Sequence, residues 1–177
     1  MTAKKELTIK QIGLVYNSQI VESEKLADFI KSKLSFNSWI CSSIELEKNT
    51  NLFENTDLVI VFGGDGTILR VAQYTSLHTS CTADVQKSIP ILGINMGRVG
   101  FMTEIQIGKI SDKSILSTIN SYIGTMRLAD LVQFEDHRSM LQININGESV
   151  KDNVLNDIVV TRHMNASLVE LSVSINE

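Results

Sequence analysis

The chain has 177 residues, of which 43% are hydrophobic, 20% are charged and one is proline, a composition that excludes disordered, collagen-like and disulfide-stapled proteins. Its net charge is −4 and its longest basic run is the pair Lys4-Lys5, so nucleic acid is not an expected partner. The longest strongly apolar run, Leu58–Phe62, is far too short to span a membrane, and no membrane partner is expected.

The cysteine content indicates a reducing compartment. The two cysteines, Cys41 and Cys81, form no Cys-x-x-Cys pair and no cluster with histidine. We therefore expect neither a zinc site nor a disulfide framework, and no residue is assigned as a metal ligand. The N-terminus lacks the apolar segment of a signal peptide. The expected location is the cytoplasm.

The first part of the chain alternates strand and helix patterns, which predicts an α/β domain. The run Leu58–Phe62 is apolar throughout, and a strand without a polar face must be covered on both sides, as in a parallel sheet flanked by helices. The expected elements, in chain order, are a strand at 9–16, an amphipathic helix around 26–34, a strand at 39–44, a strand at 58–62, a helix from 68, a loop at 75–88, a strand at 89–94 and a helix from 111.

After about residue 125 the pattern changes to strict alternation, which is typical of antiparallel strands with one face toward a core. Apolar residues alternate with polar ones over 141–145 and 169–175, and Asn146-Gly147 is a strong hairpin signal. We therefore expect a Rossmann-like α/β domain with a parallel sheet at 1–125 and a partial antiparallel β domain at 126–177. The last expected strand stops without a partner, which predicts that the chain ends early or that a homo-oligomer supplies the missing strand.

A glycine-rich loop joins the buried strand to the next helix, with the sequence Gly63-Gly64-Asp65-Gly66-Thr67. Glycines let a backbone turn sharply and approach phosphate oxygens, and the following helix offers its positive end to the same anion. The charge of Asp65 opposes phosphate, which makes sense if this carboxylate holds Mg²⁺ or takes a proton from an attacking hydroxyl. Alternatively, Asp65 or Thr67 caps the helix and the glycines serve the turn. On the residues alone both roles stay open.

A second glycine-rich segment, Asn95–Phe101, follows the strand expected at 89–94. Two such loops would meet at the carboxyl edge of a parallel sheet, where ligands bind. The alternative is an ordinary exit from a strand, and Phe101 taken by itself is expected in the core.

The third motif is the polar pair Asn156-Asp157 inside an apolar run. Such a pair is costly to bury unless it is hydrogen-bonded or faces a ligand, and its groups suit the hydroxyls and base edge of a nucleoside. Without further context, a turn at the start of a strand is the favoured interpretation.

At these three motifs the sequence resembles the NAD kinase family. It matches the Gly-Gly-Asp-Gly-Thr loop at Gly63–Thr67, the Asn-x-Gly-x-x-Gly-Phe segment at Asn95–Phe101 and the Asn-Asp/Glu motif at Asn156-Asp157, in the family's order. Arg138 and Leu141 resemble the Arg-x-x-Leu stretch that opens the family's second domain. The resemblance covers nearly the whole chain.

The resemblance implies a kinase that transfers the γ-phosphoryl group of ATP to the 2′-hydroxyl of the adenosine ribose of NAD, giving NADP. It makes Asp65 the catalytic carboxylate, and ATP, accompanied by Mg²⁺, and NAD the small-molecule partners. The implied cofactor-binding residues are Gly63, Gly64, Gly66 and Thr67 at the phosphate turn, Asn95 and Gly97 in the second loop, Phe101 along the dinucleotide, and Asn156 and Asp157 on NAD.

The chain departs from the family pattern in lacking a second Gly-Asp-Gly element and a Thr-Pro-Thr-Gly-Ser-Thr-Ala-Tyr-like segment. Two alternatives to an NAD kinase stay open. A lipid kinase of the diacylglycerol kinase type has a similar first loop, but it carries a Pro-x-Gly-Thr-x-Asn-like loop where this chain has Asn95–Gly100. A catalytically idle nucleotide-binding or oligomerisation module would bind NAD tightly without turnover.

Overall fold

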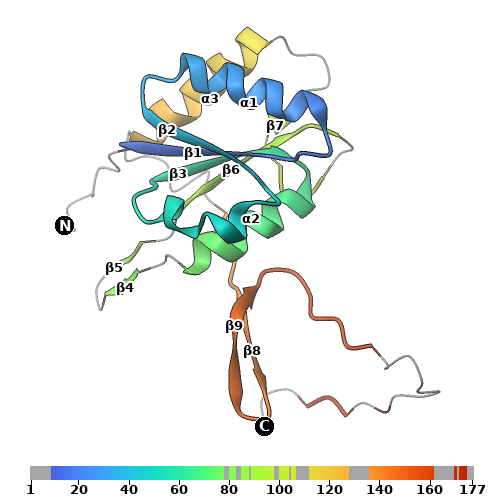
Figure 1. Cartoon of the computed structure of the whole chain (residues 1–177). Helices are drawn as coiled ribbons and strands as arrows, with labels where there is room; N and C mark the ends of the chain where they lie inside the picture. Colours follow the sequence, from blue (N-terminus) through green and yellow to red (C-terminus); the bar gives the residue numbers. More distant parts are fainter. Residues whose placement is uncertain are drawn as a thin grey trace.

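A five-stranded parallel sheet forms the centre of the computed structural model (Figure 1). The structure describes residues 9–77, 80–82, 85–87, 89–97, 100–103, 105–106, 112–127, 136–161, 170 and 172–174. The sheet has the order β2-β1-β3-β6-β7, and every neighbouring pair is parallel. Its strands are β1 (Gln11–Tyr16), β2 (Asn37–Ser42), β3 (Leu58–Gly63), β6 (Ile91–Asn95) and β7 (Ile105–Gln106). The predicted α/β class is confirmed.

Three helices cover both faces of this sheet. Helices α1 (Val21–Lys33) and α3 (Asp112–Arg127) lie on one face, and α2 (Asp65–Leu77) lies on the other (Figure 1). All six residues of β3 are buried, and they divide between the two faces. Leu58, Ile60 and Phe62 belong to the core under α1 and α3, while Val59 and Val61 join the core under α2. The prediction that the apolar run Leu58–Phe62 is covered on both sides is therefore confirmed.

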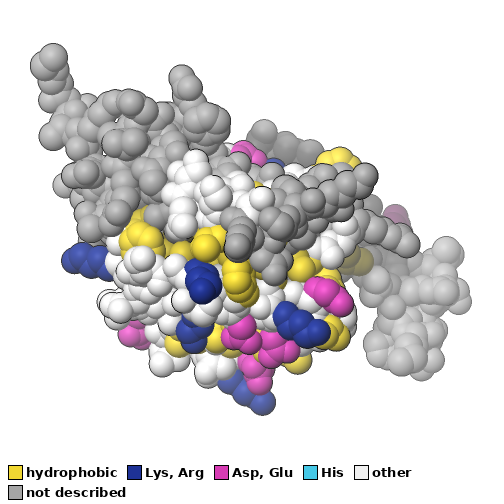
Figure 2. Space-filling model, turned by 90° about the horizontal axis from the view of Figure 1, so that it is seen from above, with side chains coloured by type: hydrophobic (Ala, Val, Ile, Leu, Met, Phe, Trp, Pro, Cys, Tyr) yellow, Lys and Arg dark blue, Asp and Glu magenta, His cyan; other side chains and the backbone are white. Residues whose placement is uncertain are grey.

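The apolar spacing and the charged ends of α1 both favour a helix. Leu26, Ala27 and Ile30 fall on one side and are buried against the sheet. The first turn carries two glutamates and the last turn two lysines, which complement the helix dipole (Glu22, Glu24, Lys31 and Lys33). On the side of the molecule that carries α1 and α3, acidic and basic side chains lie interspersed (Figure 2). None of the helices among the described residues is long and apolar enough to cross a membrane.

The prediction of a loop at 75–88 is wrong in two respects. Helix α2 continues to Leu77, and the strands β4 (Ser80–Thr82) and β5 (Val85–Lys87) pair as an antiparallel hairpin. Strands of three residues offer too few positions for an alternating pattern to stand out, which explains why polarity alone suggested a loop. Between β2 and β3 the chain forms two short 3₁₀ turns, Leu46–Lys48 and Thr50–Phe53.

The second part of the chain contains the predicted hairpin. Strands β8 (Leu141–Ile145) and β9 (Glu148–Val154) pair antiparallel, and the turn residues Asn146 and Gly147 have φ values of 54° and 86°. Positive φ at both central residues is the geometry of a type I′ turn, for which Asn-Gly is preferred. The hairpin lies beside α2, and Asn153 Nδ2 donates to Ser76 Oγ at 3.3 Å.

Two expectations for this part are not met. Leu141 and Ile145 are 54% and 59% exposed, so the alternating face of β8 does not lie against a core within the described residues. The strand expected at 169–175 is absent from residues 170 and 172–174, while the others of this range lie outside the described residues. An alternating pattern yields a strand only where a neighbouring strand accepts its backbone hydrogen bonds.

Candidate functional site

The loop Gly63–Thr67 lies where β3 ends and α2 begins. Gly63 is the last residue of β3 and Asp65 is the first of α2, so Gly64 occupies the capping position between them. The Gly64 carbonyl accepts hydrogen bonds from the Thr67 and Ile68 amides at 2.9 and 3.2 Å, which closes the first turn. Asp65 thereby sits at the carboxyl edge of the sheet, within the positive end of α2.

Two backbone amides from the loop after β6 hold the Asp65 carboxylate. Its Oδ2 accepts a hydrogen bond from the Phe101 amide at 2.9 Å, and its Oδ1 accepts one from the Met102 amide at 3.1 Å. A carboxylate offers about four acceptor positions, so each oxygen keeps room for a further donor or a cation. The carboxylate is therefore oriented by bonds to another loop, which is a different role from capping its own helix.

The two glycine-rich loops meet, as predicted. Gly63 and Asn95 are partners in the register of β3 and β6, and the Met96 amide donates to the Gly63 carbonyl at 3.1 Å. The buried Asn95 side chain accepts a hydrogen bond from the Gly97 amide at 2.9 Å, which tightens the exit of β6. The predicted residues of the first and second motifs thus share one edge of the sheet.

The glycines of these loops leave backbone uncovered. A Cβ placed on Gly64, Gly66 or Gly97 would meet no atom within 4 Å, so a ligand can approach the main chain there. Gly63 differs, because a Cβ on it would overlap the side chain of the buried Thr67. Gly63 is therefore required for packing, whereas the other three glycines leave an open surface.

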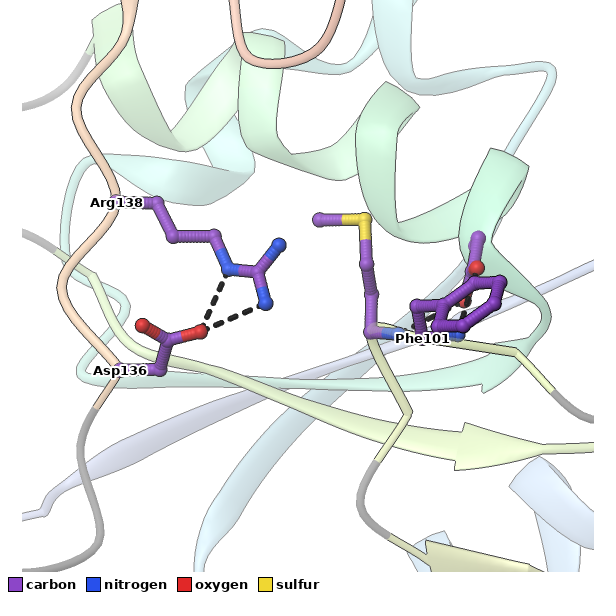
Figure 3. A network of polar contacts seen from close by, with 5 residues as sticks. Phe101, Asp136 and Arg138 are labelled. Atoms are coloured by element: carbon purple, nitrogen blue, oxygen red, sulfur yellow. Dashed lines mark hydrogen bonds and ion pairs between the residues drawn. The ribbon is translucent and has the colours of Figure 1, made fainter.

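Phe101 does not lie in the core, contrary to what its residue type alone predicts. The residue is 96% exposed, although its amide is bound to Asp65. Figure 3 shows the ring beside the first turn of α2. An exposed aromatic ring next to a carboxylate and a glycine-rich turn is a surface on which a base or a sugar can stack.

Asn156 and Asp157 belong to the segment that follows β9 and not to either of these two loops. Both side chains are exposed, so the desolvation cost that singled them out in the sequence does not arise. The structure brings together the first two motifs but leaves the third on a separate segment.

The strand β1 contributes to the same edge of the sheet, which sequence patterns did not indicate. The Asn17 amide is hydrogen-bonded to the Phe62 carbonyl at 3.0 Å and to Ser23 Oγ at 2.9 Å. The Ser23 hydroxyl lies 3.1 Å from both the Asn17 and the Phe62 carbonyl oxygens. Ser23 is fully buried and fixes the end of β1 against the end of β3, directly before Gly63.

Two groups near this edge have shifted pKa values. Burial, followed by a hydrogen bond to Glu24, raises the pKa of the Tyr16 hydroxyl at the end of β1. Burial, with the charge of Glu45 as a second cause, raises the pKa of the Cys41 thiol. Both groups therefore stay protonated and neutral at pH 7.

Arg138 forms an ion pair with Asp136 in the segment before β8, with Nη2 and Oδ2 separated by 2.7 Å (Figure 3). The two side chains are 45% and 65% exposed, so the pair contributes little to stability. Among the described residues, no group of three histidine, cysteine or acidic side chains is placed to hold a metal ion.

A parallel sheet with helices on both faces, and with two glycine-rich loops and a carboxylate at its carboxyl edge, defines an open α/β domain, a class in which ligands bind at that edge. Within that class the chain belongs to the ATP-NAD kinase family, because residues 3–120 match the ATP-NAD kinase N-terminal domain.

Several similar proteins carry the name NAD kinase. The chain is 32% identical over 174 residues to the NAD kinase of Dehalococcoides mccartyi (strain CBDB1), covering 94% of this chain and 54% of the relative. It is 28% identical over 171 residues to that of Carboxydothermus hydrogenoformans, covering 95% and 54%. It is 37% identical over 122 residues to that of Clostridium tetani, covering 68% and 36%. The chain thus spans about half the length of the first two relatives.

Proposed function

We propose that the protein carrying this chain transfers the γ-phosphoryl group of ATP to the 2′-hydroxyl of the adenosine ribose of NAD and produces NADP. The observation that carries this proposal is the position of Asp65, a carboxylate at the first residue of α2, oriented by two amides of the neighbouring loop. Membership of the ATP-NAD kinase family and the names of the relatives support NAD as the acceptor.

In the proposed reaction, Asp65 acts as the general base. The 2′-hydroxyl gives its proton to the Asp65 carboxylate while a bond forms between the 2′-oxygen and the γ-phosphorus. The bond from that phosphorus to the bridging oxygen breaks, and ADP leaves with the electron pair. Such a transfer needs mainly alignment and charge neutralisation, so no covalent nucleophile is required.

The proposed phosphate site is the turn of Gly63, Gly64, Gly66 and Thr67. Its support is the uncovered backbone at Gly64 and Gly66, together with the positive end of α2. In the second loop, Asn95 and Gly97 shape the adjoining wall, and the exposed ring of Phe101 lies along the dinucleotide. Asn156 and Asp157 are proposed to reach NAD from the segment after β9.

Mg²⁺ is proposed to arrive with ATP. The ATP phosphates would supply ligands of the ion, because Mg²⁺ at such sites is usually bound through substrate phosphates. Asp65 is kept for the proton of the 2′-hydroxyl, so no side chain of this chain is assigned to the ion. The ion would neutralise charge on the phosphates.

The proposal also includes location and assembly. Cys41 is a free thiol, which fits a reducing cytoplasm. The exposed apolar side chains of β8, Leu141 and Ile145, fit burial in a homo-oligomer. Sedimentation analysis of the purified chain tests the second point, because a monomer at all concentrations would contradict it.

The test of the activity is incubation of the purified chain with Mg-ATP and NAD, with NADP detected by an NADP-specific dehydrogenase. A parallel reaction without Mg²⁺ tests the metal, and a third replaces NAD with vesicles containing diacylglycerol. We expect NADP in the complete reaction only. Calorimetric binding of NAD without NADP would favour an idle nucleotide-binding module, and phosphorylated lipid would favour the lipid kinase.

A further inference from the structure

Gly100, in the second glycine-rich segment, lies directly beside the Asp65 carboxylate. If a Cβ is built on Gly100, its three nearest atoms all belong to the Asp65 side chain: Oδ1, Cγ and Oδ2. The Cγ would lie only 2.9 Å from that Cβ, which is closer than real side chains allow. Any residue other than glycine at this position must therefore displace either the carboxylate or the loop.

The hydrogen bonds of the two following residues, Phe101 and Met102, require the loop to lie close to Asp65. The Phe101 and Met102 amides donate to the two different oxygens of Asp65, at 2.9 and 3.1 Å. Two parallel bonds fix both the position and the rotation of the carboxylate, where one bond would fix only its distance. These amides reach the carboxylate because the Cα of Gly100 passes directly beside it.

The loop after β6 also packs against Gly93 in β6. A Cβ on Gly93, in β6, would stand 3.1 Å from both the Met102 carbonyl oxygen and the Thr103 Cα. The loop therefore lies between the bare backbone of Gly93 and the carboxylate of Asp65, and it has little room to retreat from an added methyl group at Gly100.

We propose that Gly100 is a positioning residue for Asp65, because its missing side chain lets two amides orient the carboxylate toward the acceptor hydroxyl. The catalytic role of Gly100 rests on the function proposed above, whereas the close contact between Gly100 and the Asp65 side chain does not depend on that function. A methyl group at Gly100 turns the carboxylate away from its two donors and leaves Asp65 chemically intact but misplaced.

A double-mutant cycle in urea unfolding tests the contact without any assay of activity. Gly100→Ala is expected to lower the unfolding midpoint of the parent chain, and most of that loss is expected to disappear in an Asp65→Ala background. The cycle cancels the backbone cost of replacing glycine by alanine, because that cost occurs in both backgrounds. Ile30→Val, a buried change on α1, is the matched control, and its loss is expected to add to that of Asp65→Ala.

Equal losses from Gly100→Ala in both backgrounds would overturn the assignment. If Gly100→Ala alone fails to fold, recovery of the fold in the Gly100→Ala/Asp65→Ala double variant supports it, and failure of both overturns it. In NADP formation we expect Gly100→Ala to lower kcat on the order of 10²-fold with little change in KM for ATP. An unchanged kcat would overturn the positioning role, and the unfolding cycle decides the contact even if the parent chain shows no turnover.

Discussion

The backbone amide of Phe101 donates a 2.9 Å hydrogen bond to the carboxylate of Asp65, a residue 36 positions earlier in the sequence. The bond joins the loop after β6 to the first residue of α2, while the Phe101 ring stays almost fully exposed. One residue therefore orients the carboxylate through its main chain and leaves its side chain available to a ligand.

Replacement of Phe101 by alanine separates these two roles. Because the ring is exposed and the amide is retained, we expect Phe101→Ala to change the free energy of unfolding by less than about 0.5 kcal/mol. NAD affinity is expected to fall by about 1–3 kcal/mol, the contribution of stacking one base on an aromatic ring. Calorimetric titration measures the affinity, with Phe101→Tyr as the control that keeps a ring. A large loss of stability with unchanged NAD affinity would assign Phe101 to folding.

Ser23 fixes the end of β1 against β3, so its removal should be costly. Ser23→Ala leaves the half-buried Asn17 amide and the buried Phe62 carbonyl without the hydroxyl, and we expect a loss of about 1–3 kcal/mol in the free energy of unfolding. Ser32→Ala is the control on the same helix, since its hydroxyl bonds the Phe29 carbonyl at an exposed position. Urea unfolding of both variants measures the difference, and equal losses would argue against a special role of Ser23.

The buried indole of Trp39 provides a test of the core under α2. Its Nε1 donates to Thr56 Oγ1 at 2.9 Å, and Thr56 in turn donates to the Leu52 carbonyl. Thr56→Val keeps the shape but removes the acceptor, and we expect about 1–3 kcal/mol of lost stability. Thr56→Ser retains the hydroxyl and should lose less. If valine is tolerated as well as serine, the hydrogen bond contributes little.

The central architecture was predictable because each of its signals is local. The run Leu58–Phe62 has no polar face, and this pattern alone requires a layer on either side of the strand. The glycines of Gly63–Thr67 mark a strand-to-helix turn, and Asn146-Gly147 marks a type I′ turn, since these residue types tolerate the backbone angles required there.

The orientation of Asp65 was not predictable, because its partners come from another loop. The bonds from Phe101 and Met102 depend on β3 and β6 being neighbours in the sheet, which no local pattern encodes. Phe101 was expected in the core for a related reason. Its residue type reports average burial, whereas its position at a ligand-binding edge depends on the fold. The closeness of Gly100 to Asp65 is likewise visible only in three dimensions.

Stability is expected to fall at alkaline pH through Cys41. Burial raises the pKa of this thiol in the folded chain above its unfolded value of about 8.5, so the folded state holds the proton more tightly. The contribution is complete below about pH 8.5 and is lost as pH rises through the folded pKa. Urea unfolding of the parent and Cys41→Ala between pH 7 and about pH 10 tests this. The variant should show a shallower fall, and identical slopes would exclude Cys41 as the cause.

The role of Asp65 as catalytic base is tested by the turnover number of Asp65→Asn in NADP formation, measured beside the parent chain together with the unfolding midpoint of both. Asparagine keeps the shape of aspartate but cannot take the proton of the 2′-hydroxyl, and its amide nitrogen cannot accept one of the two bonds from the Phe101 and Met102 amides. We expect a folded variant that still binds NAD and whose kcat is lower by about 10²–10⁴-fold. A folded Asp65→Asn chain with the kcat of the parent would contradict the assignment of Asp65 as the catalytic base.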